Sequence, residues 1–249
     1  MNFGSAIKII QEGNSYCLVD SSEIESFTPN MLDAHYWQEK NAVTGSAQGR
    51  GTTWFVEHAC KLTAEKKQWV LRHYYRGGLI GKIINDSYLF TSNNKTRAAC
   101  EFSLLDYMQQ LALPAPKPIA CRVIRHGLFY TADLLSSRIE SAQDLVALLS
   151  TKSLSPKLWE KVGVTIKRFH DNNIYHHDLN AHNILVDEDD VVYLIDFDRG
   201  EVRKNNQETW QQANMARLQR SFLKEQTKLP TFHWQDDNWQ QLLVGYNKK

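Results

Sequence analysis

The chain has 249 residues, enough for one large domain or two smaller lobes with buried cores. Hydrophobic residues make up 42% and charged residues 23% of it, which is typical of a globular protein. The formal net charge of +1 excludes a global field that would attract nucleic acid, so any anion-binding surface has to be local.

No targeting or membrane-spanning segment is predicted. The first sixteen residues lack a basic stretch followed by an apolar one, and no apolar run approaches the roughly 20 residues that cross a bilayer. We therefore expect any membrane contact to be peripheral. The four cysteines show no Cys-pair metal spacing, and we expect reduced thiols.

The first half of the chain is predicted to be rich in strands. Residues 1–40 are expected to form short strands and one or two helices, and a glycine-rich segment follows at residues 44–51. β-branched and aromatic residues predict strands at residues 52–56, 68–75, 119–124 and 127–132. One helix is predicted at residues 96–112, because its apolar residues recur every three or four positions before a proline cluster.

The second half is predicted to be mainly helical. Residues 133–137 are interpreted as a connector, after which helices are predicted at residues 144–149, 156–169 and from residue 208 onward. Between the last two helices, a hairpin is predicted from residues 184–186 and 191–197, joined by an acidic turn.

Three polar side chains between these helices carry the strongest chemical signal. Asp178 is followed five residues later by Asn183, and Asp196 ends the apolar strand that follows. Kinase-type folds use an Asp to accept the proton of an attacking hydroxyl, and an Asn and a second Asp to hold Mg²⁺ on the ATP phosphates. We therefore predict Asp178 as the catalytic base, and Asn183 and Asp196 as metal ligands, since Mg²⁺ prefers such oxygen donors.

The order of elements then predicts an α+β, bilobal, protein-kinase-like fold. Residues 1–132 would form a β-rich N-terminal lobe with the glycine loop and one helix. Residues 133–249 would form a helical C-terminal lobe with the catalytic loop, and the two would make one kinase-like domain. We expect the nucleotide to lie in a cleft between the lobes.

The glycine-rich segment is predicted to bind phosphate. Gly45, Gly49 and Gly51 would let backbone N–H groups approach the anion, and Arg50 would add positive charge. Such a segment is often only a turn, and the kinase-like order of elements is what favours binding. It lacks the GxxxxGK[ST] pattern, which excludes a P-loop NTPase.

A second cation is predicted on the next strand. Arg72 occupies the place where protein kinases carry a Lys, so it would contact the α- and β-phosphates and pair with a helix carboxylate, for which Glu101 is the candidate. The alternative reading of Glu101 is an exposed helix residue. Lys82 is the alternative phosphate contact.

Other features depart from protein kinases or have ordinary explanations. His177 replaces the Arg that precedes the catalytic Asp in protein kinases, and no A-P-E segment follows Asp198; both argue against activation by loop phosphorylation. Asp198 also replaces the Gly of D-F-G. One of the two adjacent histidines, His176 or His177, is expected to brace the loop. The basic amphipathic helix that contains Arg217 is interpreted as a surface helix or, alternatively, as a contact for anionic lipid.

Together these motifs resemble the Kdo kinases, where Kdo is 3-deoxy-D-manno-octulosonic acid, among the lipopolysaccharide core kinases of the protein-kinase-like fold. The resemblance runs from about residue 37 to residue 239. It is carried by TGSA at residues 44–47, GRGTT at residues 49–53, RHYYRGG at residues 72–78, DLNAHN at residues 178–183 and DFD at residues 196–198.

The resemblance implies that ATP donates its γ-phosphate to the 4-hydroxyl of Kdo on a lipid A precursor, Kdo-lipid IVA. The reaction would require Mg²⁺ and take place at the cytoplasmic face of a Gram-negative inner membrane. From charge and position, we add the hypothesis that four cations contact the anionic acceptor: Arg72, Arg76, Lys82 and Arg97.

Three other functions remain open. The chain could be another small-molecule or protein kinase of the same fold, because all of these share the catalytic residues. The Arg at position 72 also leaves open an inactive nucleotide-binding scaffold, and the basic helix a peripheral lipid-binding protein without catalysis. We infer neither a nucleic-acid partner nor an obligate protein partner.

Overall fold

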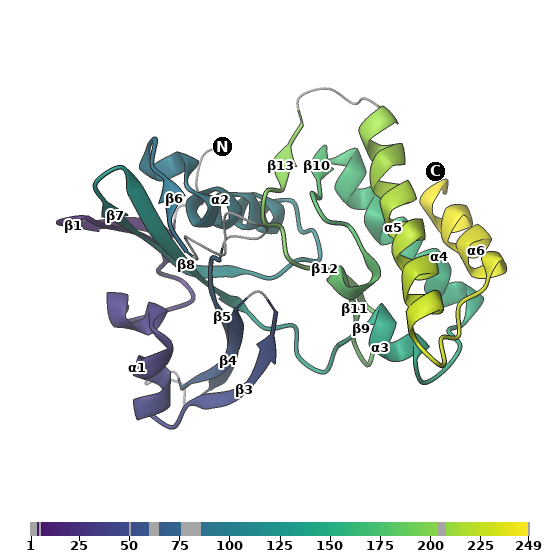
Figure 1. The fold of residues 1–249 in the computed structure, drawn as a ribbon, viewed down its shortest axis with the longest axis horizontal. Coiled ribbons are helices and arrows are strands. Elements are labelled where there is room, and N and C mark those ends of the chain that lie inside the picture. The colour runs from purple at the N-terminus through teal and green to yellow at the C-terminus, as the bar shows by residue number, and fades with distance from the viewer. Residues whose placement is uncertain are drawn as a thin grey trace. The chain divides into compact units, whose positions relative to one another are not determined.

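The computed structural model describes residues 4, 6–49, 51–59, 65–75, 86–203 and 208–248. The chain divides into two compact units (Figure 1). The first unit comprises Met1–Gln110 and Pro116–Arg138, and the second comprises Leu111–Ala115 and Ile139–Lys249. The first contains a large antiparallel sheet and the second is mainly helical, which confirms the predicted α+β class.

The sheet of the first unit is antiparallel and has eight strands in the order β1-β2-β7-β8-β5-β4-β3, with the short β6 paired to β8. The strands are β1 (Ile7–Glu12), β2 (Ser15–Asp20), β3 (Val43–Gln48), β4 (Thr52–Ala59), β5 (Lys66–His73), β6 (Tyr88–Leu89), β7 (Pro118–His126) and β8 (Phe129–Ser137).

Helices in this unit are α1 (Ala34–Glu39) and α2 (Arg97–Gln110), with 3₁₀ turns η1 (Pro29–Leu32) and η3 (Asn93–Lys95). Ala120 of β7 packs in one apolar cluster with Trp37 of α1, whereas α2 packs against β7 and β8. The first six residues of β7 are all buried. Alternate residues of a strand face opposite sides, so this run shows that β7 is covered on both faces.

The predicted connector at residues 133–137 is wrong. Residues 133–137, interpreted as a connector, form the second half of β8 and pair with both β5 and β7. This run contains the polar residues Asp133, Ser136 and Ser137. Asp133 is buried because Arg122 and His73 bind its carboxylate, so its polarity is compensated inside the sheet.

The second unit contains four helices in the described residues, together with short strands and one 3₁₀ turn. The helices are α3 (Leu145–Leu149), α4 (Pro156–Asp171), α5 (Glu208–Lys228) and α6 (Asp236–Tyr246). The short elements are β9 (Gln143–Asp144), β10 (Ile174–Tyr175), η4 (Ala181–Asn183), β11 (Ile184–Val186), β12 (Val192–Leu194) and β13 (Glu201–Val202). No helix in the described ranges is both long and apolar enough to cross a bilayer.

Helix α4 forms the centre of this unit. Ser155 caps its N-terminus through Leu158 N–H, and Pro156 takes the first helical position, where a missing N–H costs nothing. Its backbone meets that of α6 at two glycines. A Cβ on Gly163 would lie 2.0 Å from the Leu242 carbonyl oxygen, and one on Gly245 would lie 2.0 Å from the Glu160 carbonyl oxygen. Only residues without a side chain permit this approach.

Candidate active site

The β11–β12 hairpin brings two of the predicted residues together. Ile184 pairs with Leu194, and the N–H of Ile195 donates to the Asn183 carbonyl at 3.0 Å. Asn183 and Asp196 therefore flank the open end of the hairpin, although they are thirteen positions apart in the sequence. The predicted hairpin is confirmed, but β12 is shorter than expected.

Strand β12 ends at Leu194, and Asp196 leaves the extended conformation two residues later. Asp196 has φ of 60°, in the left-handed region that non-glycine residues rarely adopt. Such a conformation costs on the order of 1 kcal/mol and persists only when its surroundings impose it. Phe197 supplies the anchor, since its buried ring stacks on Phe169 with centroids 5.6 Å apart.

His176 links this segment to the loop that carries the predicted base. Its Nδ1 accepts from the Asp178 N–H at 3.1 Å, and its Nε2 lies 2.9 Å from the Ile195 carbonyl oxygen. Both contacts require a neutral ring that is protonated on Nε2. Burial lowers the pKa of His176 below its usual value, which keeps the ring neutral. The expectation that one of the two histidines braces the loop is confirmed for His176.

Two asparagine amides bind the backbone of Asp178. The side-chain N–H groups of Asn183 and Asn180 donate to the Asp178 carbonyl at 2.9 and 3.0 Å. The amide of Asn183 therefore turns its oxygen away from that carbonyl, and the side chain is almost fully buried. This oxygen and the Asp196 carboxylate form a donor set that suits Mg²⁺, which is usually held by one or two protein oxygens together with phosphates.

These oxygens are too few to form a cage by themselves. In the described ranges, no group of three or more His, Cys, Asp or Glu side chains is arranged to hold a metal. A divalent ion at Asn183 and Asp196 would therefore need ligands from water and from the phosphates of a nucleotide.

Helix α5 supplies residues that the sequence interpretation missed. Asn214 exchanges hydrogen bonds with the backbone of His176, at 3.0 Å to its carbonyl and 3.4 Å from its N–H. Arg217 binds Oδ1 of Asp178 through Nε, at 2.9 Å, and through Nη2. Ser221 accepts from the Ala181 N–H at 3.0 Å.

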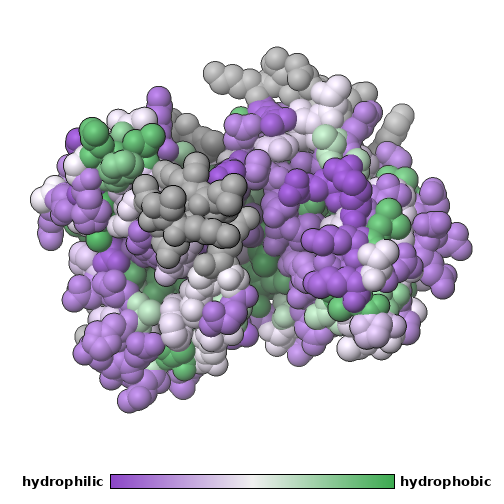
Figure 2. Space-filling view, viewed as in Figure 1, coloured by the Kyte–Doolittle hydropathy of each residue, from purple (hydrophilic) through white to green (hydrophobic). Residues whose placement is uncertain are grey.

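These contacts with the loop add to the interpretation of the helix as a surface element, which its exposed residues such as Arg217 fit. Much of the face that carries α5 is hydrophilic (Figure 2). Residues 214, 217 and 221 recur at spacings of three and four, so they lie on one side of the helix. Leu218 and Phe222 are buried on the same helix, but a polar stripe beside an apolar one usually faces solvent, so the sequence alone did not indicate these contacts.

In the first unit, Arg72 forms the predicted ion pair with Glu101, at 2.5 Å between Nη2 and Oε2. The hydroxyl of Tyr74 donates to the same oxygen at 2.6 Å. Glu101 is 4% exposed, so it is not an ordinary surface residue. Burial and the charge of Glu101 raise the pKa of Tyr74 well above its usual value, so its phenol stays protonated and can donate.

A second guanidinium lies beside this pair. Arg97, at the start of α2, stacks over the ring of Tyr74 at 5.5 Å and over that of Tyr88 at 4.9 Å. It also donates to the Tyr88 hydroxyl at 2.7 Å. Arg72 lies 5.0 Å from the centre of the Tyr74 ring, so one tyrosine joins both cations.

The glycine segment is partly strand. Gly45 lies within β3 at a register shift, whereas Gly49 and Gly51 lie at the turn to β4, closed by the Gly49 N–H donating to the Gly51 carbonyl. A Cβ on Gly51 would lie 2.0 Å from the Tyr75 ring, so a larger residue there would have to displace this ring. The remaining predicted cations, Arg50, Arg76 and Lys82, lie outside the described residues.

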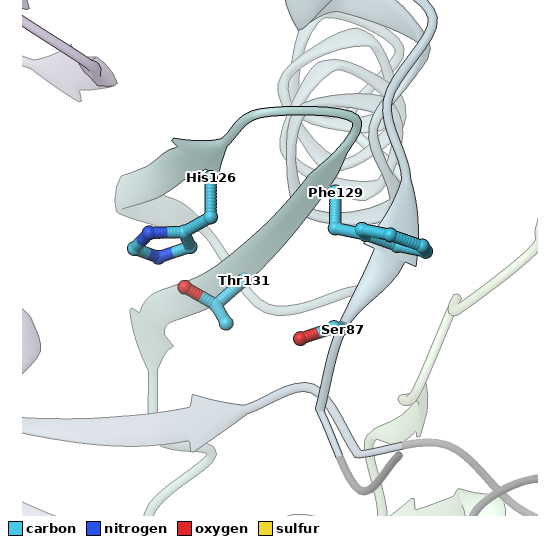
Figure 3. A pocket seen from close by; sticks show the side chains of 4 residues that line it. All are labelled: Ser87, His126, Phe129 and Thr131. Atoms are coloured by element: carbon cyan, nitrogen blue, oxygen red, sulfur yellow. The ribbon is translucent and has the colours of Figure 1, made fainter.

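An open pocket of about 360 Å³ also lies in the first unit. Its lining residues are Ser87, His126, Phe129 and Thr131, with the two hydroxyl groups between the two rings (Figure 3). None of these four described lining residues is a predicted site residue. Nothing in it matches the chemistry of phosphoryl transfer.

Comparison with known proteins supports a common ancestry with kinases. The Lipopolysaccharide kinase (Kdo/WaaP) family matches residues 34–246. A 3-deoxy-D-manno-octulosonic acid kinase of Vibrio vulnificus is 45% identical over 239 residues, which cover 96% of this chain and 98% of that protein.

Proteins of the same name in two further organisms are similarly close. The one from Photobacterium profundum is 46% identical over 228 residues, covering 88% of this chain and 93% of that protein. The one from Mannheimia succiniciproducens is 43% identical over 241 residues, covering 95% and 98% respectively. This family has the protein-kinase-like fold. The chain therefore belongs to the lipopolysaccharide kinase (Kdo/WaaP) family, and it is a kinase.

Proposed function

We propose that this kinase transfers the γ-phosphate of ATP to the 4-hydroxyl of Kdo on Kdo-lipid IVA. The reaction would occur at the cytoplasmic face of the inner membrane of a Gram-negative bacterium, with peripheral membrane contact. The names of the similar proteins support a Kdo acceptor. The observation that carries the chemistry is the set of hydrogen bonds that joins Asp178 to Asn183, and Asn183 to Ile195, the residue before Asp196.

Asp178 would act as the general base. Its carboxylate would accept the proton of the acceptor hydroxyl as the hydroxyl oxygen bonds to the γ-phosphorus and the bond to the ADP oxygen breaks. The loop fixes the backbone that carries this carboxylate through the contacts of Asn180, Asn183 and His176 to the Asp178 N–H and carbonyl. Positioning of this kind accounts for much of the catalysis in phosphoryl transfer.

Asn183 and Asp196 would hold Mg²⁺ through their side-chain oxygens. A bound ion would neutralise charge that develops on the phosphate oxygens. Arg72 would contact the phosphates of ATP while Glu101 and Tyr74 hold its guanidinium, and the glycine segment with Gly45, Gly49, Arg50 and Gly51 would contribute backbone N–H groups and charge. Arg76, Lys82 and Arg97 stay candidates for the anionic acceptor.

The test is transfer from γ-labelled ATP to Kdo-lipid IVA in detergent, with and without Mg²⁺. Wild-type protein should transfer label only with Mg²⁺, and a 4-deoxy acceptor should stay unlabelled. Asp178→Ala should lose transfer while ATP binding survives. Transfer by Asp178→Ala at the wild-type rate would contradict the assignment of the base.

A panel of other acceptors completes the test. Faster transfer to another sugar or to a protein, with none to Kdo-lipid IVA, would replace the proposed acceptor by that substrate. ATP binding without transfer to any acceptor would instead indicate an inactive scaffold.

A further inference from the structure

We propose that Arg217 on α5 is a positioning residue for the catalytic base, fixing which oxygen of Asp178 receives the proton of the acceptor hydroxyl. This inference rests on the proposed role of Asp178. It adds a residue 39 positions further along the chain, on a helix outside the catalytic loop.

The geometry of the contact is selective for one oxygen. Both guanidinium contacts, from Nε and Nη2, go to Oδ1 of Asp178. In the described part of the chain, no hydrogen bond is found to Oδ2. A carboxylate accepts through both oxygens when it is free. With Oδ1 held by two charged donors, Oδ2 is the oxygen left to accept a proton.

Helix α5 is itself tied to the loop on either side of Arg217. Three positions before it, Asn214 is buried and bonded in both directions to the backbone of His176. Four positions after it, Ser221 accepts from the Ala181 N–H. These two contacts, on either side of Asp178 in the loop, fix the position of the helix against the loop. They therefore also fix the position of the Arg217 backbone relative to Asp178.

Stability does not explain the pair. The side chains of Arg217 and Asp178 are 48% and 44% exposed. Exposed ion pairs contribute about 0–1 kcal/mol, because solvent screens them and ordering two side chains costs entropy. The same contact has a larger effect on catalysis, where a misplacement of about 1 Å can cost about a hundredfold in rate.

The experiment compares Arg217→Gln with Arg220→Gln. Both variants remove one exposed cation from the same helix, and no contact of Arg220 with Asp178 is found in the described residues. For transfer to Kdo-lipid IVA, Arg217→Gln should lower kcat by about tenfold to a hundredfold, with the KM values for ATP and acceptor unchanged. Arg220→Gln should match wild type.

Arg217→Lys should restore part of kcat, because an ammonium retains the charge but replaces the two-donor contact by a point charge. The free energy of unfolding of Arg217→Gln should stay within about 0.5 kcal/mol of wild type, which separates a positioning role from a folding defect.

Three results would overturn the inference. Equal kcat for the Gln variants at 217 and 220 would show that the contact has no catalytic role. A raised acceptor KM with unchanged kcat would assign Arg217 to acceptor binding instead. Absence of transfer by wild-type protein would refute the proposed function, and the inference with it. This result differs from failure of the inference alone, because wild type and every variant would then be equally inactive.

Discussion

At the scale of single residues, Glu101 shows how a buried charge is compensated by specific partners. Glu101 is buried, yet Arg72 and Tyr74 both bind the same oxygen of its carboxylate. A carboxylate in such a place is tolerated only while its partners remain, since an unpaired buried charge is strongly unfavourable. Arg72 therefore serves stability and, in the proposed function, nucleotide binding.

Replacing Arg72 by Met should affect both properties. We expect the free energy of unfolding to fall by about 3 kcal/mol, because Glu101 loses its charged partner, and the KM for ATP to rise. Arg72→Lys should lose less stability, since an ammonium still pairs with the carboxylate. Urea unfolding and steady-state kinetics would measure the two effects. Unchanged ATP kinetics in the Met variant would remove Arg72 from the nucleotide site.

A buried histidine makes stability depend on pH. Burial lowers the pKa of His170 from its usual 6.5 to about 4. The full contribution of His170 to the free energy of unfolding is present above pH 6.5. This contribution is lost as the pH falls toward 4, because the unfolded state takes up a proton that the folded state does not. Between pH 7.5 and pH 5 this amounts to about 2 kcal/mol.

Urea unfolding of wild type and His170→Gln at these two pH values would measure that contribution. The variant should lose about 2 kcal/mol less than wild type on acidification. An identical loss in both proteins would show that His170 is not the group responsible.

At the scale of elements, helix contacts decide how the second unit is held together. The α4 and α6 backbones touch at Gly163 and Gly245, which a helical periodicity does not reveal, because glycine carries no hydrophobic signal. Helical periodicity likewise does not reveal the contacts of α5 with the loop that carries Asp178. The periodicity predicted a helix, but its polar stripe could be assigned to the loop only when the packing was known.

Gly163→Ala should destabilise the protein. In an exposed helix this change stabilises by about 1 kcal/mol, but here the new Cβ would meet the Leu242 carbonyl, so we expect a loss of about 2 kcal/mol. Hydrogen exchange should accelerate in α6. Val164→Ala, at the exposed neighbouring position, is the control and should change stability by less than about 0.5 kcal/mol. A Gly163→Ala variant as stable as wild type would contradict the close helix contact.

At the scale of the whole molecule, the proposed function draws on residues of both units. Arg72 and Glu101 belong to the first, and Asp178, Asn183 and Asp196 to the second. If these residues act on one nucleotide, Mg·ATP should stabilise the chain as any ligand stabilises the state that binds it.

We expect Mg·ATP at about a hundred times its Kd to add about 2.7 kcal/mol, and so to raise Tm by about 5–10 °C. EDTA should remove most of this increase. Asp196→Asn and Arg72→Met should each reduce it, and Arg220→Gln should retain it. A full increase in Tm for Asp196→Asn would exclude that residue as a metal ligand.

The spacing of Asp178, Asn183 and Asp196, the hairpin between them and most helices and strands could be read from residues alone. These features depend on local periodicity and on a few polar side chains within about twenty positions, which a linear sequence displays directly. The same holds for the pairing of Arg72 with Glu101, because the order of elements matched a known arrangement.

Tertiary structure alone decided the extent of the central strand β8 and the contact between Arg217 and Asp178. Residues 133–137 became part of a central strand because Arg122 and His73 compensate the charge of Asp133. Arg217 reached Asp178 because two contacts register α5 against the loop. In each case at least one deciding partner lies 38 or more positions away, as His73 does from Asp133 and Asn214 from His176. The gain from pairing a charge depends on where the chain's packing places its partner, which no local pattern encodes.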